Sequence, residues 1–196
     1  MEISGANTEF LMVRKMQTQS YYQKAIKFAA LKHVEQNQLV PGTNLPYVVH
    51  LSNVAMEILI AAQNSPNFDI DFSVQVALLH DTLEDTSTTL EELSEVFGAT
   101  IAEGVLALTK NGDLPKSERM EDSLNRIRKL QKEIWAVKLA DRITNLQIPP
   151  QHWDTAKKIA YQKEAILILE ELKGGNAFLE NRLRLKIAEY EKYLQT

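Results

Sequence analysis

The sequence predicts an all-α protein with a single domain. Apolar residues recur at intervals of three and four along most of the chain, which is the periodicity of helices that bury one face. Capping residues precede many of these segments, and glycine or proline follows them. Val, Ile and Thr occur throughout, but no strand-like alternation continues between the turn signals. With 196 residues, 44% of them hydrophobic, the chain can bury one sizeable core, so we expect one domain over residues 1–196.

The first expected helix starts near Phe10 or Ser20 and ends near Glu35. Residues 1–8 are mostly polar or small, and the segment 1–20 is expected to be loosely ordered or peripheral. The apolar content of this helix comes from Ala25, Ile26, Phe28, Ala29, Ala30 and Leu31.

A loop is predicted over residues 36–46, because the helical periodicity stops there and two prolines and a glycine interrupt the chain. A helix is then expected from Tyr47 to about Gln63, and His50 lies in its first turn. A turn over Asn64–Asp71 separates it from the next helix.

The central expected helix is apolar nearly all round between Val74 and Leu79, so it should lie in the core. It ends in one imidazole and three carboxylates, which belong to His80, Asp81, Glu84 and Asp85. If the helix continues through residue 85, residues 80 and 84 share one face and residues 81 and 85 share another. Burial of this much charge costs several kcal/mol per ion, which a divalent cation would offset. The alternative is a helix end that frays into a solvated acidic loop.

The rest of the chain is expected to form helices separated by turn residues. Two overlapping capping boxes, Thr88 with Glu91 and Thr89 with Glu92, start the first of them, and Gly98 is its expected stop. The others are expected over residues 101–110, in a basic segment that follows residue 119, over 134–146 before two prolines, over 154–172 with Asp154 as cap, and over 176–194 with Asn176 as cap.

The composition excludes several classes of protein. The net charge of −4 and the isoelectric point near 5.6 argue against a broad basic surface, so neither nucleic acid nor membrane is expected as a partner. The lack of cysteine excludes disulfides and thiolate zinc sites and fits a cytoplasmic protein. No apolar run approaches the roughly 20 residues that span a bilayer. The last helix is as compatible with internal packing as with dimerisation, so the oligomeric state stays open.

Four potential metal ligands lie beside apolar residues on three expected helices: His50, His80, Asp81 and Asp141. Two imidazoles and two carboxylates suit Mn²⁺, Fe²⁺, Zn²⁺ or Mg²⁺. Each residue also has an ordinary structural explanation, since a buried His is often a hydrogen-bonded core residue and a buried Asp is often a cap or half of an ion pair. The spacing by itself leaves both interpretations open.

The order of these residues resembles the H…HD…D pattern of the HD superfamily of metal-dependent phosphohydrolases. The similarity is closer to the hydrolase domain of RelA/SpoT proteins and to stand-alone small alarmone hydrolases, and it extends from about Ala25 into the C-terminal helix. It is carried by ALLHDTLEDT over residues 77–86, VKLADR over residues 137–142, Pro46-Tyr47, Phe97-Gly98 and Asn145. The resemblance implies an HD-type helical bundle with a central buried metal-binding helix.

The resemblance also implies an activity, which is the removal of pyrophosphate from the 3′ position of (p)ppGpp, usually with Mn²⁺. By resemblance, the metal ligands are His50, His80, Asp81 and Asp141. Glu84 and Asp85 correspond to the pair that orients or deprotonates the attacking water, and Asn145 corresponds to a residue of the nucleotide pocket. Such chemistry needs a cation, a nearby carboxylate and good positioning.

Further side chains are candidates for holding the substrate. Lys138 and Arg142 flank residue 141, and Lys116 and Arg119 follow a turn, so these four cations are hypothesised to bind phosphate. Lys138 has the alternative of a solvated lysine, and Arg142 has the alternative of pairing with Glu84 or Asp85. Tyr161 is a candidate for stacking on a base, with a core position as its alternative.

One departure from the family pattern concerns the loop before His50. Alarmone hydrolases carry an Arg-Arg-Lys-like cluster there, whereas residues 35–40 of this chain contain no cation, and Leu51 stands where proline is common. The resemblance therefore supports the metal ligands more strongly than it supports the identity of the substrate. The alternatives are an HD phosphohydrolase for another nucleotide or a phosphate monoester, and a non-catalytic nucleotide-binding sensor. Segments 36–46 and 110–119 are expected to close over a substrate, and one activity is expected because no synthetase-like region follows.

Overall fold

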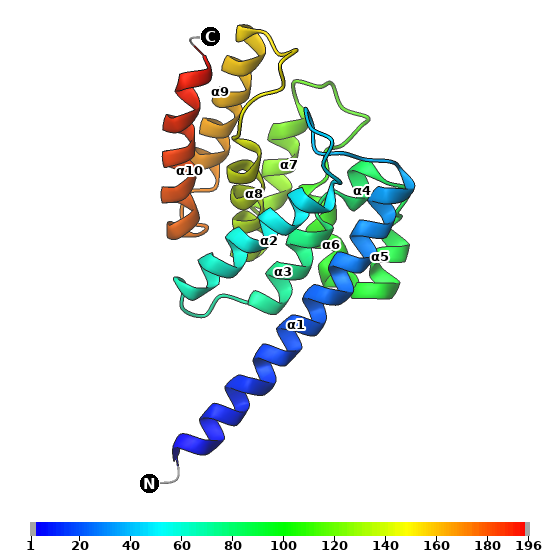
Figure 1. Cartoon of the computed structure of the whole chain (residues 1–196), viewed down its shortest axis with the longest axis vertical. Coiled ribbons are helices and arrows are strands. Elements are labelled where there is room, and N and C mark those ends of the chain that lie inside the picture. The colour runs from blue at the N-terminus through cyan, green and yellow to red at the C-terminus, as the bar shows by residue number, and fades with distance from the viewer. Residues whose placement is uncertain (1–2, 195–196) are drawn as a thin grey trace.

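The computed structural model describes residues 3–194, and it describes side chains from Met16 onward. The helices are α1 Ile3–Glu35, α2 Val48–Gln63, α3 Ile70–Leu79, α4 Thr82–Asp85, α5 Leu90–Phe97, α6 Ala99–Leu108, α7 Arg119–Ile127, α8 Lys132–Asn145, α9 Thr155–Glu171 and α10 Ala177–Tyr190, followed by a 3₁₀ turn at Glu191–Tyr193 (Figure 1). Within these residues the extended pairing amounts to one bridge, between Leu39 and Pro46. The predicted all-α class is confirmed.

Helix α3 is the centre of the packing. It contacts α1, α2, α6 and α8, and each residue from Phe72 to Leu79 is buried. A helix that is apolar all round has to be enclosed on every side, because no face of it is suited to water. The prediction that this helix lies in the core is therefore confirmed, and the other helices are arranged around it.

The first helix begins earlier than predicted. Helix α1 starts at Ile3, well before Phe10 or Ser20, and no proline or glycine interrupts it after Gly5. The expected loose end over residues 1–8 is thus helical from residue 3, while residues 1 and 2 lie outside the described part. In Figure 1 the first turns of α1 project away from the other helices, and its later turns run alongside α3.

The central helix does not continue through Asp85 as one unit. Helix α3 ends at Leu79, and α4 starts at Thr82. The hydroxyl of Thr82 donates to the carbonyl of Leu79 at 2.7 Å, and Nδ1 of His80 donates to the carbonyl of Ala77 at 2.7 Å. These side-chain bonds use carbonyls that a regular helix would pair with backbone N–H groups. The resulting bend separates the metal-ligand positions from the two acids that follow.

Side-chain caps start four of the described helices, α3, α5, α9 and α10. Thr89, Asp154 and Asn176 cap α5, α9 and α10 as predicted. The predicted box of Thr88 with Glu91 is wrong, because the hydroxyl of Thr88 bonds instead to that of Thr86 at 2.8 Å. Gly98 ends α5 with a φ of 91°, a backbone conformation that favours glycine. None of the described helices combines the length and the apolar character needed to cross a bilayer.

A substitution at Gly104 tests the close approach of α6 to α8. A Cβ atom at this position would lie 2.6 Å from Cδ1 of Ile134 and 3.4 Å from side-chain atoms of Phe72 and Val76. We expect Gly104→Val to lower the free energy of unfolding by about 2 kcal/mol, because overpacking forces neighbouring side chains out of place. Urea denaturation measures the effect. Gly112→Ala is the control, since a Cβ atom there meets nothing within 4 Å, and equal losses in both variants would contradict the packing argument.

Candidate metal centre and adjoining cavities

Helices α2, α3 and α8 pack against one another and bring four potential ligands into one place. The four are His50 in the first turn of α2, His80 and Asp81 directly after α3, and Asp141 in α8. Ligand atoms of His50, His80 and Asp141 all lie within 4.8 Å of one another, and all three residues are buried. Segments far apart in the sequence thus form one compact group of donors.

Asp81 belongs to the same group. Its Oδ2 atom lies 2.9 Å from Nε2 of His80 and 3.6 Å from Nε2 of His50. The two Nε2 atoms are 3.3 Å apart. Oδ1 of Asp141 lies 3.5 Å from Nε2 of His50 and 3.7 Å from Nε2 of His80. The structure brings together all four residues that the sequence singled out. Three buried residues and the half-buried Asp81 thus offer two nitrogen and two oxygen donors, a set that fits a divalent cation.

A surrounding layer of hydrogen bonds holds these ligands in position. Lys138 donates to Oδ2 of Asp141 at 3.0 Å, and the amide of Asn145 donates to Oδ1. The hydroxyl of Tyr47 donates to Asp81. Because Nδ1 of His80 is bonded to a backbone carbonyl, its Nε2 faces the centre. Partners of this kind fix the orientation of metal ligands.

The electrostatics of the centre show how the protein balances the buried charges. Burial alone would raise the pKa of Asp141, but Lys138 and the two histidines hold it well below its ordinary value. Burial opposes ionisation of Asp81 as well, and the charged His80 lowers the pKa of this carboxyl. For His80 itself, burial lowers the pKa, but the two carboxylates raise it to about 10. A proton on His80 therefore supplies positive charge that a cation would replace on binding.

The two acids of α4 are in different environments. Glu84 is engaged at both oxygens, since it pairs with the ammonium of Lys110 at 3.0 Å and accepts from the backbone N–H of the same residue at 3.0 Å. Burial, together with the charge of Asp81, raises the pKa of Asp85 to about 6, although a hydrogen bond from Gln38 acts in the opposite direction. Asp85 is thus the carboxyl whose protonation changes near neutral pH.

Two of the four candidate phosphate-binding cations have partners inside the protein. Lys138 is buried against Asp141, so the alternative of a solvated lysine is wrong. Arg142 is buried and pairs with Glu164, so the alternative pairing with Glu84 or Asp85 is wrong as well. The guanidinium of Arg142 also lies 4.4 Å from the centroid of the Tyr161 ring. Both cations therefore support groups that line the site.

The other two candidate cations are Arg119, the first residue of α7, and Lys116, in the segment before it. Arg119 donates to the carbonyl of Leu114 at 2.8 Å and to that of Gly112 at 2.7 Å, so it closes its own loop. Lys116 is exposed in the same loop. The pair of Lys110 with Glu84 connects the start of this loop to the acids of α4.

Sequence reasoning missed several residues that stand behind the ligands. The buried His33 stacks on Tyr47 with ring centroids 4.6 Å apart, and its Nδ1 bonds to the side chain of Gln38. Gln38 in turn bonds to Asp85. The Pro46-Tyr47 pair was part of the family resemblance, but nothing in the sequence distinguished His33 from a surface residue in a last helical turn. These contacts join the loop before α2 to the centre.

A cavity of about 260 Å³ opens beside the candidate metal centre. His50 and Asn145 are on its wall, and Trp153, Tyr161 and Tyr190 supply aromatic surface. Trp153 and Tyr161 meet edge to face with centroids 5.0 Å apart. Among the described residues neither Lys nor Arg lines it. The geometry suits a flat, weakly polar group next to the metal ligands.

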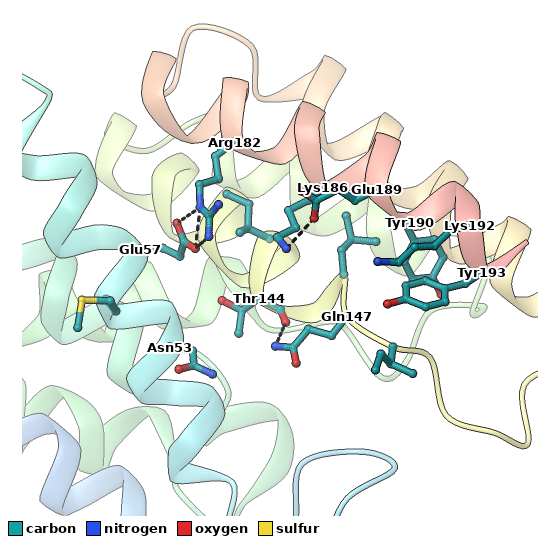
Figure 2. A pocket seen from close by; sticks show the side chains of 14 residues that line it. Asn53, Glu57, Thr144, Gln147, Arg182, Lys186, Glu189, Tyr190, Lys192 and Tyr193 are labelled. Carbon is teal, nitrogen blue, oxygen red and sulfur yellow. Dashed lines mark hydrogen bonds and ion pairs between the residues drawn. The ribbon is translucent and has the colours of Figure 1, made fainter.

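A second cavity, of about 450 Å³, shares part of its wall with the first. Figure 2 shows the residues that line this second cavity. It lies between α2, the end of α8 and α10, and it is lined on the α10 side by charged residues. The residues common to both cavities are Asn53, Thr144, Gln147, Ile148 and Tyr190. The two cavities are therefore neighbours on either side of these residues.

Comparisons with known proteins agree with this site. Residues 25–172 match the model of a family described as HD domain. Guanosine-3′,5′-bis(diphosphate) 3′-pyrophosphohydrolase MESH1 of Danio rerio is 37% identical over 166 residues, which are 82% of this chain and 89% of that protein. The Homo sapiens protein of the same name is 36% identical over the same shares. The similarity therefore covers nearly the whole length of these relatives.

A solved structure supports the same relationship. A metazoan ortholog of SpoT, described as hydrolysing ppGpp, has a TM-score of 0.75 and 28% identity to this chain. The match covers 89% of this chain and 96% of that one. The predicted HD-type bundle is thus confirmed.

Removal of a bound cation should lower the stability of the protein. At a free cation concentration of about one hundred times Kd, a ligand that binds only the folded state adds about 2.7 kcal/mol to the free energy of unfolding. We expect this increment on addition of Mn²⁺ to chelator-treated protein, and we expect its loss in His50→Ala. Urea denaturation with and without Mn²⁺ measures it. His152→Ala, which changes an exposed histidine outside the site, should retain the increment, and an unchanged increment in His50→Ala would contradict the assignment.

Proposed function

Since this chain belongs to the HD-domain family, which includes guanosine-3′,5′-bis(diphosphate) 3′-pyrophosphohydrolases, we propose that it removes pyrophosphate from the 3′ position of ppGpp. The observation that carries the proposal is the similarity to MESH1 over nearly the full length of that enzyme, at 37% identity. The donor set of two histidines and two aspartates supports it, because hydrolysis in this family depends on a divalent cation.

Each residue of the centre has a part in the proposed reaction. His50, His80, Asp81 and Asp141 would hold the cation, which we propose to be Mn²⁺. When bound, such a cation lowers the pKa of water and neutralises charge on a phosphoryl oxygen. Lys138 and Asn145 keep Asp141 in place, and Tyr47 does the same for Asp81. These contacts preorganise the ligands before the substrate arrives.

Asp85 is the proposed base. In the hydrolysis, a water oxygen bonds to the phosphorus next to the 3′ oxygen, and the bond between this phosphorus and the 3′ oxygen breaks. Pyrophosphate leaves, and the 3′ oxygen takes up a proton from solvent to become a hydroxyl of the ribose. The water must lose a proton, and Asp85 accepts it best with a pKa near the working pH, as the value of about 6 provides. Glu84 is held by Lys110 and is proposed to orient the water.

The guanine ring is proposed to occupy the cavity beside the centre. Asn145 and the ring of Tyr161 lie on its wall, which fits their hypothesised roles in binding the nucleotide. Stacking of a base on an aromatic side chain contributes about 1–3 kcal/mol. Lys116, in the loop before α7, remains a proposed phosphate contact, because it is exposed and close in sequence to the segment that Glu84 and Lys110 connect.

A second candidate function is the hydrolysis of another nucleotide or of a phosphate monoester. It is favoured by the lack of cations on the wall of the cavity beside the centre, among the described residues. Purified protein with Mn²⁺ should be offered ppGpp, nucleoside triphosphates and phosphate monoesters. We expect pyrophosphate release from ppGpp, which phosphate detection after pyrophosphatase treatment measures. Strong turnover of a monoester without cleavage of ppGpp would refute the first proposal.

The Asp85→Asn variant separates catalysis from folding. A base contributes about 10²–10⁴ in rate, so we expect turnover to fall at least about 100-fold. We also expect the free energy of unfolding at pH 7 to rise by about 1 kcal/mol, after allowance for the partial exposure of the carboxyl. The sign follows from the raised pKa: the folded state favours neutral Asp85, so its charge costs stability above the ordinary pKa, and the neutral amide removes this cost.

Steady-state kinetics and urea denaturation measure the two effects. In the wild type, the rate should fall as the pH is lowered through about 6, because protonated Asp85 accepts no proton. Glu103→Gln, an exposed acid of α6, should change neither quantity. Full activity of Asp85→Asn would remove Asp85 from the mechanism and favour a non-catalytic sensor.

A further inference from the structure

The proposed substrate carries more negative charge than the metal centre and its surroundings can balance. From His33 to Thr109 the sequence contains no Lys or Arg, so α2, α3, α4 and the loop before α2 supply no permanent cation. The nearest cations already have carboxylate partners: Lys110 pairs with Glu84, Lys138 pairs with Asp141, and Arg142 pairs with Glu164. A nucleotide with phosphates on both the 3′ and the 5′ side needs a second positive region.

The cavity along α10 provides such a region within reach of the centre. Asn53 and Thr144, which belong to both cavities, lie three residues after His50 and Asp141 in their helices. Residues three apart lie about one helical turn from each other on the same face. The second cavity therefore begins about one turn from the metal ligands, and Figure 2 shows the side chain of Lys186 on the α10 side of it, bonded to Glu189.

The cations of this cavity differ in how firmly they are held. Arg182 makes three hydrogen bonds of 2.7–2.9 Å to the buried Glu57, so it is fixed. Lys186 pairs at 2.9 Å with Glu189, whose side chain is 58% exposed, and an exposed pair of this kind is weak. Within residues 16–194, Lys192 forms no ion pair, and its ammonium lies 4.9 Å from the centroid of the Tyr193 ring. Lys186 and Lys192 are thus held less firmly than Arg182, and a stronger anion could displace Glu189 from Lys186.

Tyr190 supplies an independent indication of a ligand. It lines both cavities and is only 1% exposed, yet its buried hydroxyl has no hydrogen-bond partner within the described residues. A buried hydroxyl without a partner is costly, and native proteins seldom leave one unless a ligand or water completes it. The hydroxyl stands on α10 in the same helical segment as Lys186.

We propose that Lys186 and Lys192 bind the 5′-phosphates of a nucleotide whose 3′ end lies at the metal centre, and that the hydroxyl of Tyr190 donates to the same ligand; this assignment rests on the proposed function. Binding replaces Glu189 at Lys186 by phosphate oxygens. The cations at α10 thereby take the place of the basic cluster that the loop before α2 lacks.

Calorimetry on the chelator-treated protein tests the proposal without turnover. The ligands are ppGpp and guanosine 3′-diphosphate, which lacks the 5′-phosphates. We expect the double variant Lys186→Ala/Lys192→Ala to bind ppGpp at least about tenfold more weakly and guanosine 3′-diphosphate as tightly as the wild type does. Tyr190→Phe should weaken ppGpp binding about fivefold, in the range of one hydrogen bond. In assays with Mn²⁺, both the double variant and Tyr190→Phe should raise the KM for ppGpp by factors similar to those expected for binding. The kcat of the double variant should equal that of the wild type.

The control is Arg184→Ala, which removes one positive charge from an exposed position of α10 that lines neither cavity. It should leave both affinities unchanged. The proposal would be overturned if the double variant bound both ligands equally weakly, if it bound ppGpp as tightly as the wild type does, or if Arg184→Ala showed the same loss. None of these results would decide whether the protein hydrolyses ppGpp, which turnover measures separately. Lysine-dependent binding of ppGpp without its cleavage would instead refute the proposed function and keep this site.

Discussion

The placement of two carboxylates, the buried Asp141 and the half-buried Asp81, between three helices is the constraint on which the rest of the structure depends. Asp81 and Asp141 lie next to two imidazoles above the apolar helix α3, where charge is poorly solvated. The protein compensates with Lys138, a proton on His80, the hydroxyl of Tyr47 and the amide of Asn145. Each compensating group comes from α8, from the start of α2 or from the ligand segment itself. The charges of the centre are therefore balanced only when these helices are packed together.

The bend at His80 places the metal ligands and the acids of α4 in different surroundings. A continuous helix would give the acids of α4 the same regular spacing as the ligands, whereas the bend lets His80 bond to a backbone carbonyl and gives Glu84 a separate partner in Lys110. Burial and the charge of Asp81 then raise the pKa of Asp85 to about 6. Binding of the cation and acceptance of a proton are thereby assigned to different carboxylates by their surroundings.

Local chemistry explains which features could be predicted from the sequence. The helical class, the buried central helix and the caps Thr89, Asp154 and Asn176 depend on neighbours within a few residues, so periodicity and residue type suffice. The partner of Arg142 on α9 and the stacking of His33 on Tyr47 depend on tertiary packing, which no local pattern contains. The four candidate ligands were selected by resemblance to a family, since their spacing alone left an ordinary structural explanation open.

The uneven placement of positive charge along the chain has a consequence for encounters in solution. The segment from α2 through α6 carries acidic residues and no Lys or Arg, while α7 to α10 carry many of both basic types. Such an arrangement creates a directional field, which steers diffusing ions over distances comparable to the Debye length, about 8 Å at physiological salt. The rates at which the protein captures small divalent cations and polyanions should therefore both depend on ionic strength, and through oppositely charged regions of the chain.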